Sequence, residues 1–305
     1  MKALETICHY EVLNEYFKVT RVESWLGWIF SFGFGSIFPG LSALGRVIIV
    51  LFAFSFATAG IFILNQYFDR KEDRENTIKS NLPVASGKIA PRTALILSLS
   101  LIILCLFLVF LVDVSLLLLF LVYLALWTVY SVPPFRLKTV PVIDFIVSGI
   151  GAGLLPFLIG ANTSHHSNSS IPLIFISAIP LMLAHSSGHL LQALGDYEAD
   201  RKTRIQTFVV KYGRKQGIIL MGFLSFITGL LPFIYVAFGL WSSSYFLLFF
   251  LPLPFCILIV KDYIATIKNP STENGVNLKE STRKYGIILM IVVGAYVLVG
   301  KTLGL

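Results

Sequence analysis

Long apolar stretches recur along the whole of this chain. About nine of them reach the roughly 18 residues that a helix needs to cross a bilayer. They lie at 24–41, 43–64, 93–112, 114–132, 141–160, 171–195, 215–240, 243–261 and 285–303. Charged residues make up 13% of the 305 residues, whereas a soluble domain has about 25%. The sequence therefore predicts an all-α integral membrane protein with about nine transmembrane helices, forming a single domain over residues 1–305.

The basic residues predict how these helices cross the membrane. If the N-terminus is cytosolic, 22 of the 24 Lys and Arg residues lie on the cytosolic side, and only Arg46 and Lys301 lie opposite. This asymmetry is the one that the positive-inside rule describes. The net charge of +8 is then explained by topology and by attraction to anionic lipid, and we expect no nucleic-acid partner. We therefore expect a cell-membrane protein whose N-terminus and site loops are cytosolic.

Acidic residues gather just after two of the apolar stretches. Asn65, Asp69 and Asp73 follow the second stretch at intervals of four residues, and Asp196 and Asp200 repeat this spacing after the sixth. On a helix such residues share one face and climb about 6 Å per step. Oxygen-bearing side chains grouped in this way are typical of a site for a hard cation such as Mg²⁺.

A plainer interpretation of the two acidic stretches is that they are solvated helix ends, paired with the basic residues beside them. However, they contain seven of the 16 acidic residues, and the positive-inside rule gives acidic residues no preference for one side. The matching spacing at two helix ends favours a shared site. We expect the two stretches to face each other and to hold Mg²⁺ and a diphosphate, with nearby cations such as Lys202 contacting phosphate or lipid headgroups.

A third stretch on the predicted cytosolic side, residues 130–138, contains the pair Pro133-Pro134. The prolines stop the helix and impose an extended turn. Arg136 and Lys138 are two residues apart, so in an extended segment their side chains point the same way. This stretch is either a positively charged membrane anchor or a clamp for diphosphate, with Tyr130 below it.

Polar residues also lie inside the predicted spans. His185, His189 and Gln192 continue the line of Asp196 and Asp200 along one helix face, and Asp144 lies one turn inside the fifth span. In lipid such residues face the bundle interior or a water-filled cavity. We therefore expect a central cavity open to the cytosol, in which these four residues line the wall or contact an acceptor. Zinc binding by the two histidines is disfavoured because no His-Glu-x-x-His pattern accompanies them.

These residues are compatible with more than one function. An enzyme would use the carboxylates to bind Mg²⁺ and cleave a carbon–oxygen bond of a diphosphate. A cation transporter could use the same carboxylates, but it should have polar groups toward both faces and a site near the midplane. An inactive scaffold is the third reading, against which the four intact aspartates argue. The clustering of carboxylates at one face favours the enzyme.

Several of these motifs resemble those of the UbiA superfamily of intramembrane prenyltransferases, and the likeness covers nearly the whole chain. The family's first signature, Asn-Asp-x-x-Asp-x-x-x-Asp, is filled by Asn65, Asp69 and Asp73, with Gln66 in place of the second-position Asp. Its second signature, Asp-x-x-x-Asp, falls on Asp196 and Asp200. The segments 130–138 and 82–87 are similar to a proline-containing loop and a Pro-x-x-Ser-Gly turn of that family.

The resemblance implies a fold of nine helices around a central cavity, with cytosolic cap loops, and Mg²⁺-dependent transfer of a prenyl group from a polyprenyl diphosphate to a lipophilic acceptor. In this reading the catalytic, metal-binding residues are Asn65, Asp69, Asp73, Asp196 and Asp200. The diphosphate would be bound by Arg136 and Lys138 with Tyr130, Lys202 and Arg21, the last of which lies where the family often has Arg-Pro. Family acceptors include quinone precursors, phenolics, tetrapyrroles and glycerol-phosphate lipids. Nothing in the sequence indicates an obligate protein partner.

Overall fold

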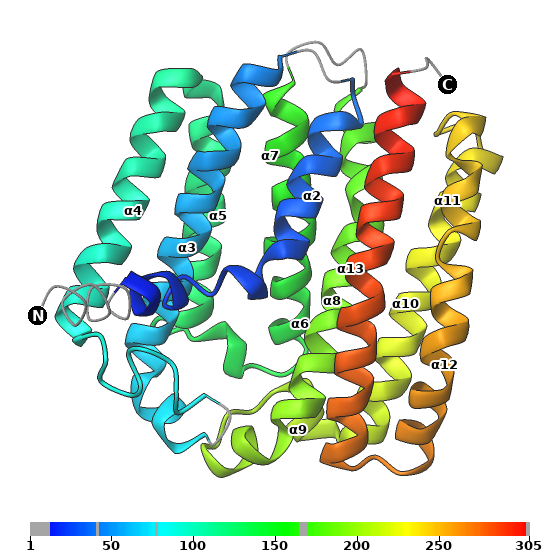
Figure 1. The fold of residues 1–305 in the computed structure, drawn as a ribbon. Helices are drawn as coiled ribbons and strands as arrows, with labels where there is room; N and C mark the ends of the chain where they lie inside the picture. The colour runs from blue at the N-terminus through cyan, green and yellow to red at the C-terminus, as the bar shows by residue number, and fades with distance from the viewer. Residues whose placement is uncertain (1–12, 41–42, 77–78, 165–169, 303–305) are drawn as a thin grey trace, which may run out of the picture. The chain divides into compact units, whose positions relative to one another are not determined.

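Helices and the loops between them make up the part of the chain that the computed structural model describes, residues 13–40, 43–76, 79–164 and 170–302 (Figure 1). Those residues include no β-strand, which confirms the predicted all-α class. The chain divides into two compact units. The first contains residues up to Leu26 and Ile48–Arg136, and the second contains Gly27–Val47 and the residues from Leu137 onward. The expectation of a single domain over residues 1–305 stays a prediction.

Eight helical segments of the described chain are long and apolar enough to cross a membrane. Six of them are single helices: α3 (Leu44–Glu75), α4 (Pro91–Val112), α5 (Val114–Ser131), α8 (Ile171–Lys202), α10 (Arg214–Ala237) and α13 (Thr272–Thr302). Two are composed of consecutive helices. One of these contains α6 (Ile143–Gly149), the π-helical η3 (Ile150–Leu154) and α7 (Leu155–Thr163), and the other contains η4 (Ser243–Phe246), α11 (Leu247–Phe250) and α12 (Leu253–Lys268). The shorter helices are η1 (Val22–Ser24), α2 (Leu26–Ile37), η2 (Leu137–Thr139) and α9 (Phe208–Tyr212).

The stretch predicted to span the membrane at 24–41 forms only α2, a helix of 12 residues. The chain leaves the helix before Pro39, and Gly40 adopts a φ of 111°, a backbone conformation that residues with a Cβ rarely adopt. The number of nine transmembrane helices therefore stays a prediction. Three other helices, α3, α8 and α13, extend well beyond their predicted apolar stretches because polar residues continue the helix.

In the first unit, α3 is joined to α4 and α5 by hydrogen bonds inside the apolar region. Ser98 of α4 donates to the carbonyl oxygen of Gly60 at 2.7 Å. The hydroxyls of Thr58 and Tyr123, on α3 and α5, lie 2.8 Å apart, and both side chains are fully buried. An unpaired polar group is costly in lipid, so these bonds favour the packing of α3 against α4 and α5. This packing orients α3, whose last turns carry polar residues.

In the second unit, α8 is the helix around which the others pack: it contacts α6, α7, α9, α10 and α13. It packs tightly against the segment Gly149–Gly153. A Cβ on Gly153 would lie 2.4 Å from the carbonyl oxygen of Leu181, and one on Gly149 would lie 2.6 Å from that of Met182. Small residues thus allow two helices to touch backbone to backbone, a common packing mode in membranes.

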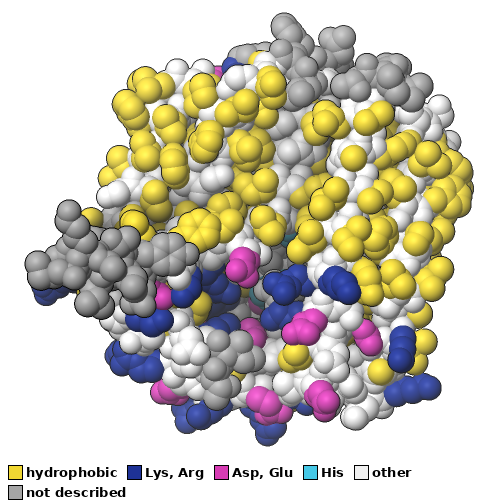
Figure 2. All heavy atoms as spheres, in the orientation of Figure 1, with side chains coloured by type: hydrophobic (Ala, Val, Ile, Leu, Met, Phe, Trp, Pro, Cys, Tyr) yellow, Lys and Arg dark blue, Asp and Glu magenta, His cyan; other side chains and the backbone are white. Residues whose placement is uncertain are grey.

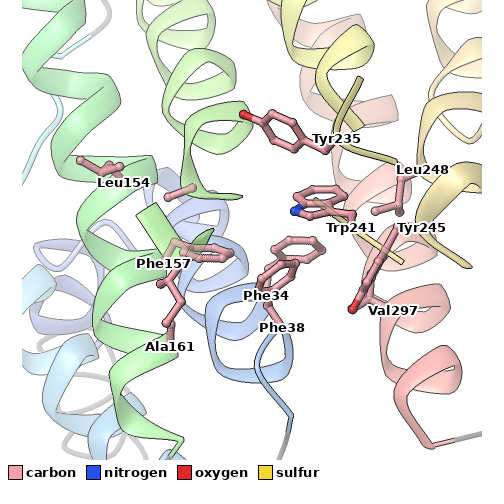
Figure 3. Close-up of a cluster of buried hydrophobic side chains, with 12 residues drawn as sticks. Phe34, Phe38, Leu154, Phe157, Ala161, Tyr235, Trp241, Tyr245, Leu248 and Val297 are labelled. Carbon is pink, nitrogen blue, oxygen red and sulfur yellow. The ribbon is translucent and has the colours of Figure 1, made fainter. Parts of the chain in front are cut away.

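An aromatic cluster forms one part of the core of the second unit (Figure 3). Phe38 packs on Phe157 at 5.7 Å between ring centroids and on Trp241 at 5.5 Å. The indole N–H of Trp241 donates to Ser177 Oγ at 2.8 Å, which satisfies the polar end of a buried ring. The cluster therefore joins α2, α7, α8 and the segment that precedes η4.

Side chains on α12 and α13 are segregated by polarity. Figure 2 shows hydrophobic side chains along the upper lengths of these helices and charged ones gathered at the lower end, where α13 begins. Exposed apolar side chains on α13 include Ile288, Ile291 and Val299. A soluble protein would not leave long helices exposed in this way, whereas lipid accommodates them. The exposed apolar side chains and the length of the helices support an integral membrane protein.

Candidate functional site

The first acidic motif lies in the last turns of α3. Its residues Asn65, Asp69 and Asp73 share one face of the helix, as their spacing predicted. Asp69 and Asp73 are only 6% and 8% exposed. Asn65 donates from Nδ2 to Asp69 Oδ2 at 2.8 Å and to Ser131 Oγ at 3.2 Å. A buried carboxylate is costly unless it is paired, so this face is either a packed polar network or a place for a cation.

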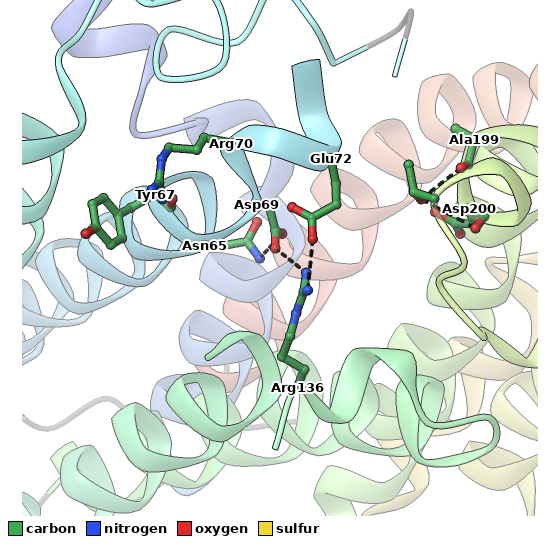
Figure 4. A network of polar contacts seen from close by, with 9 residues as sticks. Asn65, Tyr67, Asp69, Arg70, Glu72, Arg136, Ala199 and Asp200 are labelled. Atoms are coloured by element: carbon green, nitrogen blue, oxygen red, sulfur yellow. Dashed lines mark hydrogen bonds and ion pairs between the residues drawn. The ribbon is translucent and has the colours of Figure 1, made fainter. Parts of the chain in front are cut away.

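Arg136, the first cation of the predicted diphosphate clamp, contacts this motif directly (Figure 4). Its Nη2 lies 3.0 Å from Asp69 Oδ1, and its Nη1 lies 2.9 Å from Glu72 Oε1. Burial lowers the pKa of Arg136, but the hydrogen bond to Glu72 and the charges of Glu72 and Asp69 outweigh it and leave the pKa raised. The structure thus brings Arg136 to the first motif. Glu72 was not predicted, because it lies outside the four-residue spacing.

Other residues of the first unit that the sequence singled out have packing contacts. Tyr130 is buried, and its ring meets Trp127 edge-on at 5.1 Å. The Arg21 guanidinium lies 5.6 Å from the ring centroid of Phe62. Gln66 is buried and donates from Nε2 to the Val19 carbonyl at 2.6 Å. An ionised Asp has no donor, so Gln66 makes here a structural contact that the aspartate of the family pattern could not make.

The second acidic motif occupies the last turns of α8. Asp200 is 7% exposed and Asp196 is half-buried. Lys202 is exposed at the end of the same helix, and Lys138 is half-buried in η2. Both acidic motifs therefore lie on helical ends, each described within its own unit.

Arg214 fixes the stretch between Asp196 and Asp200. Its guanidinium lies 4.1 Å from the ring centroid of Tyr197, and its Nη2 donates to Glu198 Oε1 at 2.6 Å. The same nitrogen donates to Thr272 Oγ1 at 2.6 Å, and Nη1 donates to the Pro270 carbonyl at 3.2 Å. Arg214 thus links the end of α8 to the starts of α10 and α13. Nothing in the sequence marked it, because its partners come from two segments distant in the sequence, the end of α8 and residues 270–272.

Asp144, predicted to be an acceptor or cavity residue, is completely buried in α6. Its Oδ2 accepts from the backbone N–H of Phe208 at 2.9 Å, and His189 Nε2 lies 3.7 Å from the same oxygen. Asp144 therefore joins α6 to the start of α9, just after the second acidic motif. The contact with His189 brings together two of the residues that the sequence placed in one cavity.

Replacing Asp144 by Ala is expected to destabilise the protein by about 1–3 kcal/mol, because the Phe208 N–H is left without its acceptor. Asp144→Asn keeps a carbonyl oxygen at this position and should lose clearly less. Thermal unfolding of the purified variants in detergent measures both changes. Equal losses for the two variants would show that the charge toward His189, and not the hydrogen bond to Phe208, carries the effect.

The remaining predicted cavity residues, His185 and Gln192, differ in their surroundings. His185 Nε2 lies 3.1 Å from Ser31 Oγ and 3.3 Å from the Gly27 carbonyl, so this side chain connects α8 to α2. Gln192 is exposed. The stripe along α8 therefore divides into a packing residue, His185, a residue beside Asp144, His189, and an exposed amide, Gln192.

The donor atoms of the two acidic motifs fit Mg²⁺. Within either unit, the described residues do not gather three His, Cys, Asp or Glu side chains around one point, as a zinc or calcium site built from protein alone would require. Each motif offers instead a pair of carboxylates. Mg²⁺ commonly takes one or two carboxylates and completes its shell with water and phosphate oxygens. The chemistry of these residues is therefore suited to a metal–phosphate complex.

Comparisons with known proteins agree with this chemistry. A model of the UbiA prenyltransferase family matches residues 26–274. The 2-acylphloroglucinol 4-prenyltransferase of Humulus lupulus is 37% identical over 192 residues, which are 60% of this chain and 43% of that protein. The digeranylgeranylglyceryl phosphate synthase of Methanosphaera stadtmanae is 27% identical over 218 residues, covering 72% of this chain and 75% of that one. The chain thus spans less than half the length of the Humulus lupulus protein.

Solved structures share the fold. A UbiA homologue from Archaeoglobus fulgidus bound to GPP and Mg²⁺ superposes with a TM-score of 0.71 at 23% identity, covering 90% of this chain and 99% of that one. A UbiA homologue from Aeropyrum pernix K1 gives a TM-score of 0.65 at 17% identity, covering 86% and 97% of the two chains.

Proposed function

The chain belongs to the UbiA prenyltransferase family, and we propose that it transfers a prenyl group from a polyprenyl diphosphate to an aromatic or lipid acceptor. Geranyl and geranylgeranyl diphosphate are the donors to test first. The observation that carries the proposal is the contact of Arg136 with the buried Asp69 at the polar end of α3. It combines a carboxylate suited to a metal with a cation suited to phosphate.

Asp69 and Asp73 in the first motif, and Asp196 and Asp200 in the second, would bind Mg²⁺, with Asn65 contributing its amide oxygen to metal or diphosphate. Bound Mg²⁺ would neutralise the charge that develops on the leaving diphosphate. Asn65 also orients Asp69 through their 2.8 Å hydrogen bond, so it has a second role whether or not its oxygen reaches the metal. Arg214 supports the second motif by fixing Tyr197 and Glu198.

Five residues are proposed to bind the diphosphate. Arg136 is the strongest candidate, because a guanidinium offers a planar fork of N–H donors that matches phosphate oxygens. Lys138 and Lys202 would add positive charge, and Tyr130 and Arg21 would complete the set. On the acceptor side we propose Asp144, His185, His189 and Gln192. Gln192 and His189 are the best candidates for contact with an acceptor, because the first side chain is exposed and the second is partly exposed.

The orientation follows from charge. We propose that the N-terminus and both acidic motifs are cytosolic, since 22 of the 24 Lys and Arg residues lie on that side in the predicted topology. A soluble diphosphate headgroup would then meet the motifs from the cytosol while its prenyl chain and the product stay in lipid.

Mg²⁺ removal tests the proposal. Purified protein in detergent is incubated with geranylgeranyl diphosphate and a panel of aromatic and glycerol-phosphate acceptors, and the product is followed by mass. We expect a prenylated product with at least one acceptor, and loss of that product in EDTA with recovery on adding Mg²⁺. If the protein shows neither product nor Mg²⁺-dependent diphosphate binding but moves cations in liposomes, the alternative of a cation transporter is correct.

A further inference from the structure

Asp69 is fully engaged by protein groups in this structure. Its Oδ1 pairs with Arg136 Nη2 at 3.0 Å, and its Oδ2 accepts from Asn65 Nδ2 at 2.8 Å. The residue is 6% exposed, so water screens these charges poorly. A cation from the protein itself thus already neutralises a carboxylate of the first motif (Figure 4).

Glu72 holds the other arm of the same guanidinium. Its Oε1 lies 2.9 Å from Arg136 Nη1, and its side chain is 28% exposed. Glu72 lies three residues after Asp69 on α3, so the two carboxylates are neighbours on the helix surface and face two nitrogens of one planar group. Arg136 is therefore positioned by two carboxylates, of which only Asp69 belongs to the acidic motif.

We infer that Arg136 is an internal counter-ion that competes with Mg²⁺ for Asp69, and that Glu72 is the positioning residue that retains it there. The inference rests on the proposed function. A divalent ion bound to Asp69 would lie close to the Arg136 guanidinium, and like charges at that range in a buried site repel strongly. Mg²⁺ alone therefore binds weakly.

A diphosphate reverses this balance. Its negative charge attracts both Mg²⁺ and Arg136, so Arg136 exchanges Asp69 for a phosphate oxygen while Mg²⁺ takes its place on the carboxylate. Each ligand then helps the other to bind, by the same factor in both directions. Mg²⁺ and the diphosphate accordingly enter as a coupled pair, which keeps the carboxylates from being loaded with metal when no donor is present.

The test compares three variants of the full chain in detergent. Arg136→Gln removes the competing cation, so bare Mg²⁺ should bind about fivefold or more tighter, while Mg²⁺–pyrophosphate should bind correspondingly weaker. Glu72→Gln removes the charge that retains Arg136, so inorganic pyrophosphate without metal should bind tighter. Arg70→Gln is the matched control for net charge: Arg70 lies on the same helix end but donates to the Tyr67 carbonyl at 2.5 Å. Its effects on all three ligands should stay within about twofold.

Mg²⁺ affinity is measured by displacement of Mn²⁺ followed by electron paramagnetic resonance, and pyrophosphate affinity by calorimetry, after thermal unfolding has shown each variant to be folded. If Arg136→Gln leaves bare Mg²⁺ binding unchanged or weaker while the unaltered protein binds Mg²⁺–pyrophosphate, the counter-ion role is wrong and the proposed function stands. If the unaltered protein does not bind Mg²⁺–pyrophosphate at all, both fail. Should Arg136→Gln not fold, unchanged pyrophosphate binding in Glu72→Gln would overturn the inference by itself.

Discussion

Replacing Asp69 by Asn is expected to lower prenyl transfer by about a thousandfold or more while the protein stays folded. The substitution keeps the size of the side chain and an oxygen that accepts from Arg136, but it removes the negative charge that Mg²⁺ needs. Metal stabilisation of a leaving group contributes several kcal/mol, and each 1.36 kcal/mol corresponds to a factor of ten in rate. Turnover is measured with the donor and acceptor found by the panel experiment.

Matched substitutions separate this effect from a general loss of acidic charge. Asp73→Asn and Asp200→Asn change the other buried carboxylates of the two motifs and should give losses of similar order. Glu75→Gln changes an exposed carboxylate at the end of the same helix as Asp69 and should leave turnover within about twofold. Full activity in Asp69→Asn at saturating Mg²⁺ would contradict a metal role for the first motif.

The helical class and the placement of the two motifs could be predicted because they rest on local patterns. In lipid the backbone N–H and C=O groups of an apolar stretch must bond to each other, which a helix achieves. A spacing of four residues then places Asn65, Asp69 and Asp73 on one face of that helix. The proximity of Arg136 to the first motif is harder to foresee, since 67 residues separate it from Asp69. The prolines of residues 130–138 and the charge of the segment were the signals that pointed to it.

Helix ends and tertiary contacts could not be predicted, because neither depends on local hydropathy alone. Hydropathy marks where lipid would be favourable, not where a helix ends, so it missed that α8 and α13 continue through polar residues. It also marked 24–41 as a span although the helix there covers 12 residues. Glu72 and Arg214 escaped notice because a tertiary partner leaves no trace in the sequence around a residue. For Asp144, the apolar surroundings indicated function, which stays a prediction, and they gave no sign of the hydrogen bond by which this residue joins two helices.

Backbone contact between helices leads to the second large effect: Gly153→Ala is expected to destabilise the protein by about 3 kcal/mol. The new Cβ would lie 2.4 Å from the Leu181 carbonyl oxygen and 2.6 Å from the Met182 nitrogen. Both atoms belong to the backbone of α8, so no side-chain rotation relieves the overlap, and the two helices must separate. Since α8 carries the second acidic motif, separation would also displace Asp196 and Asp200.

Gly229→Ala is the control for the substitution itself. Gly229 lies within α10, and apart from the neighbouring backbone of that helix no heavy atom of the described residues comes within 4 Å of a Cβ placed there. Alanine favours helices over glycine by roughly 0.5–1 kcal/mol, so this variant should be as stable as the unaltered protein or slightly more stable. Thermal unfolding in detergent measures both variants. A Gly153→Ala protein as stable as Gly229→Ala would mean that α8 does not touch this segment backbone to backbone, and the position of the second motif would then depend on the other helices that pack against α8.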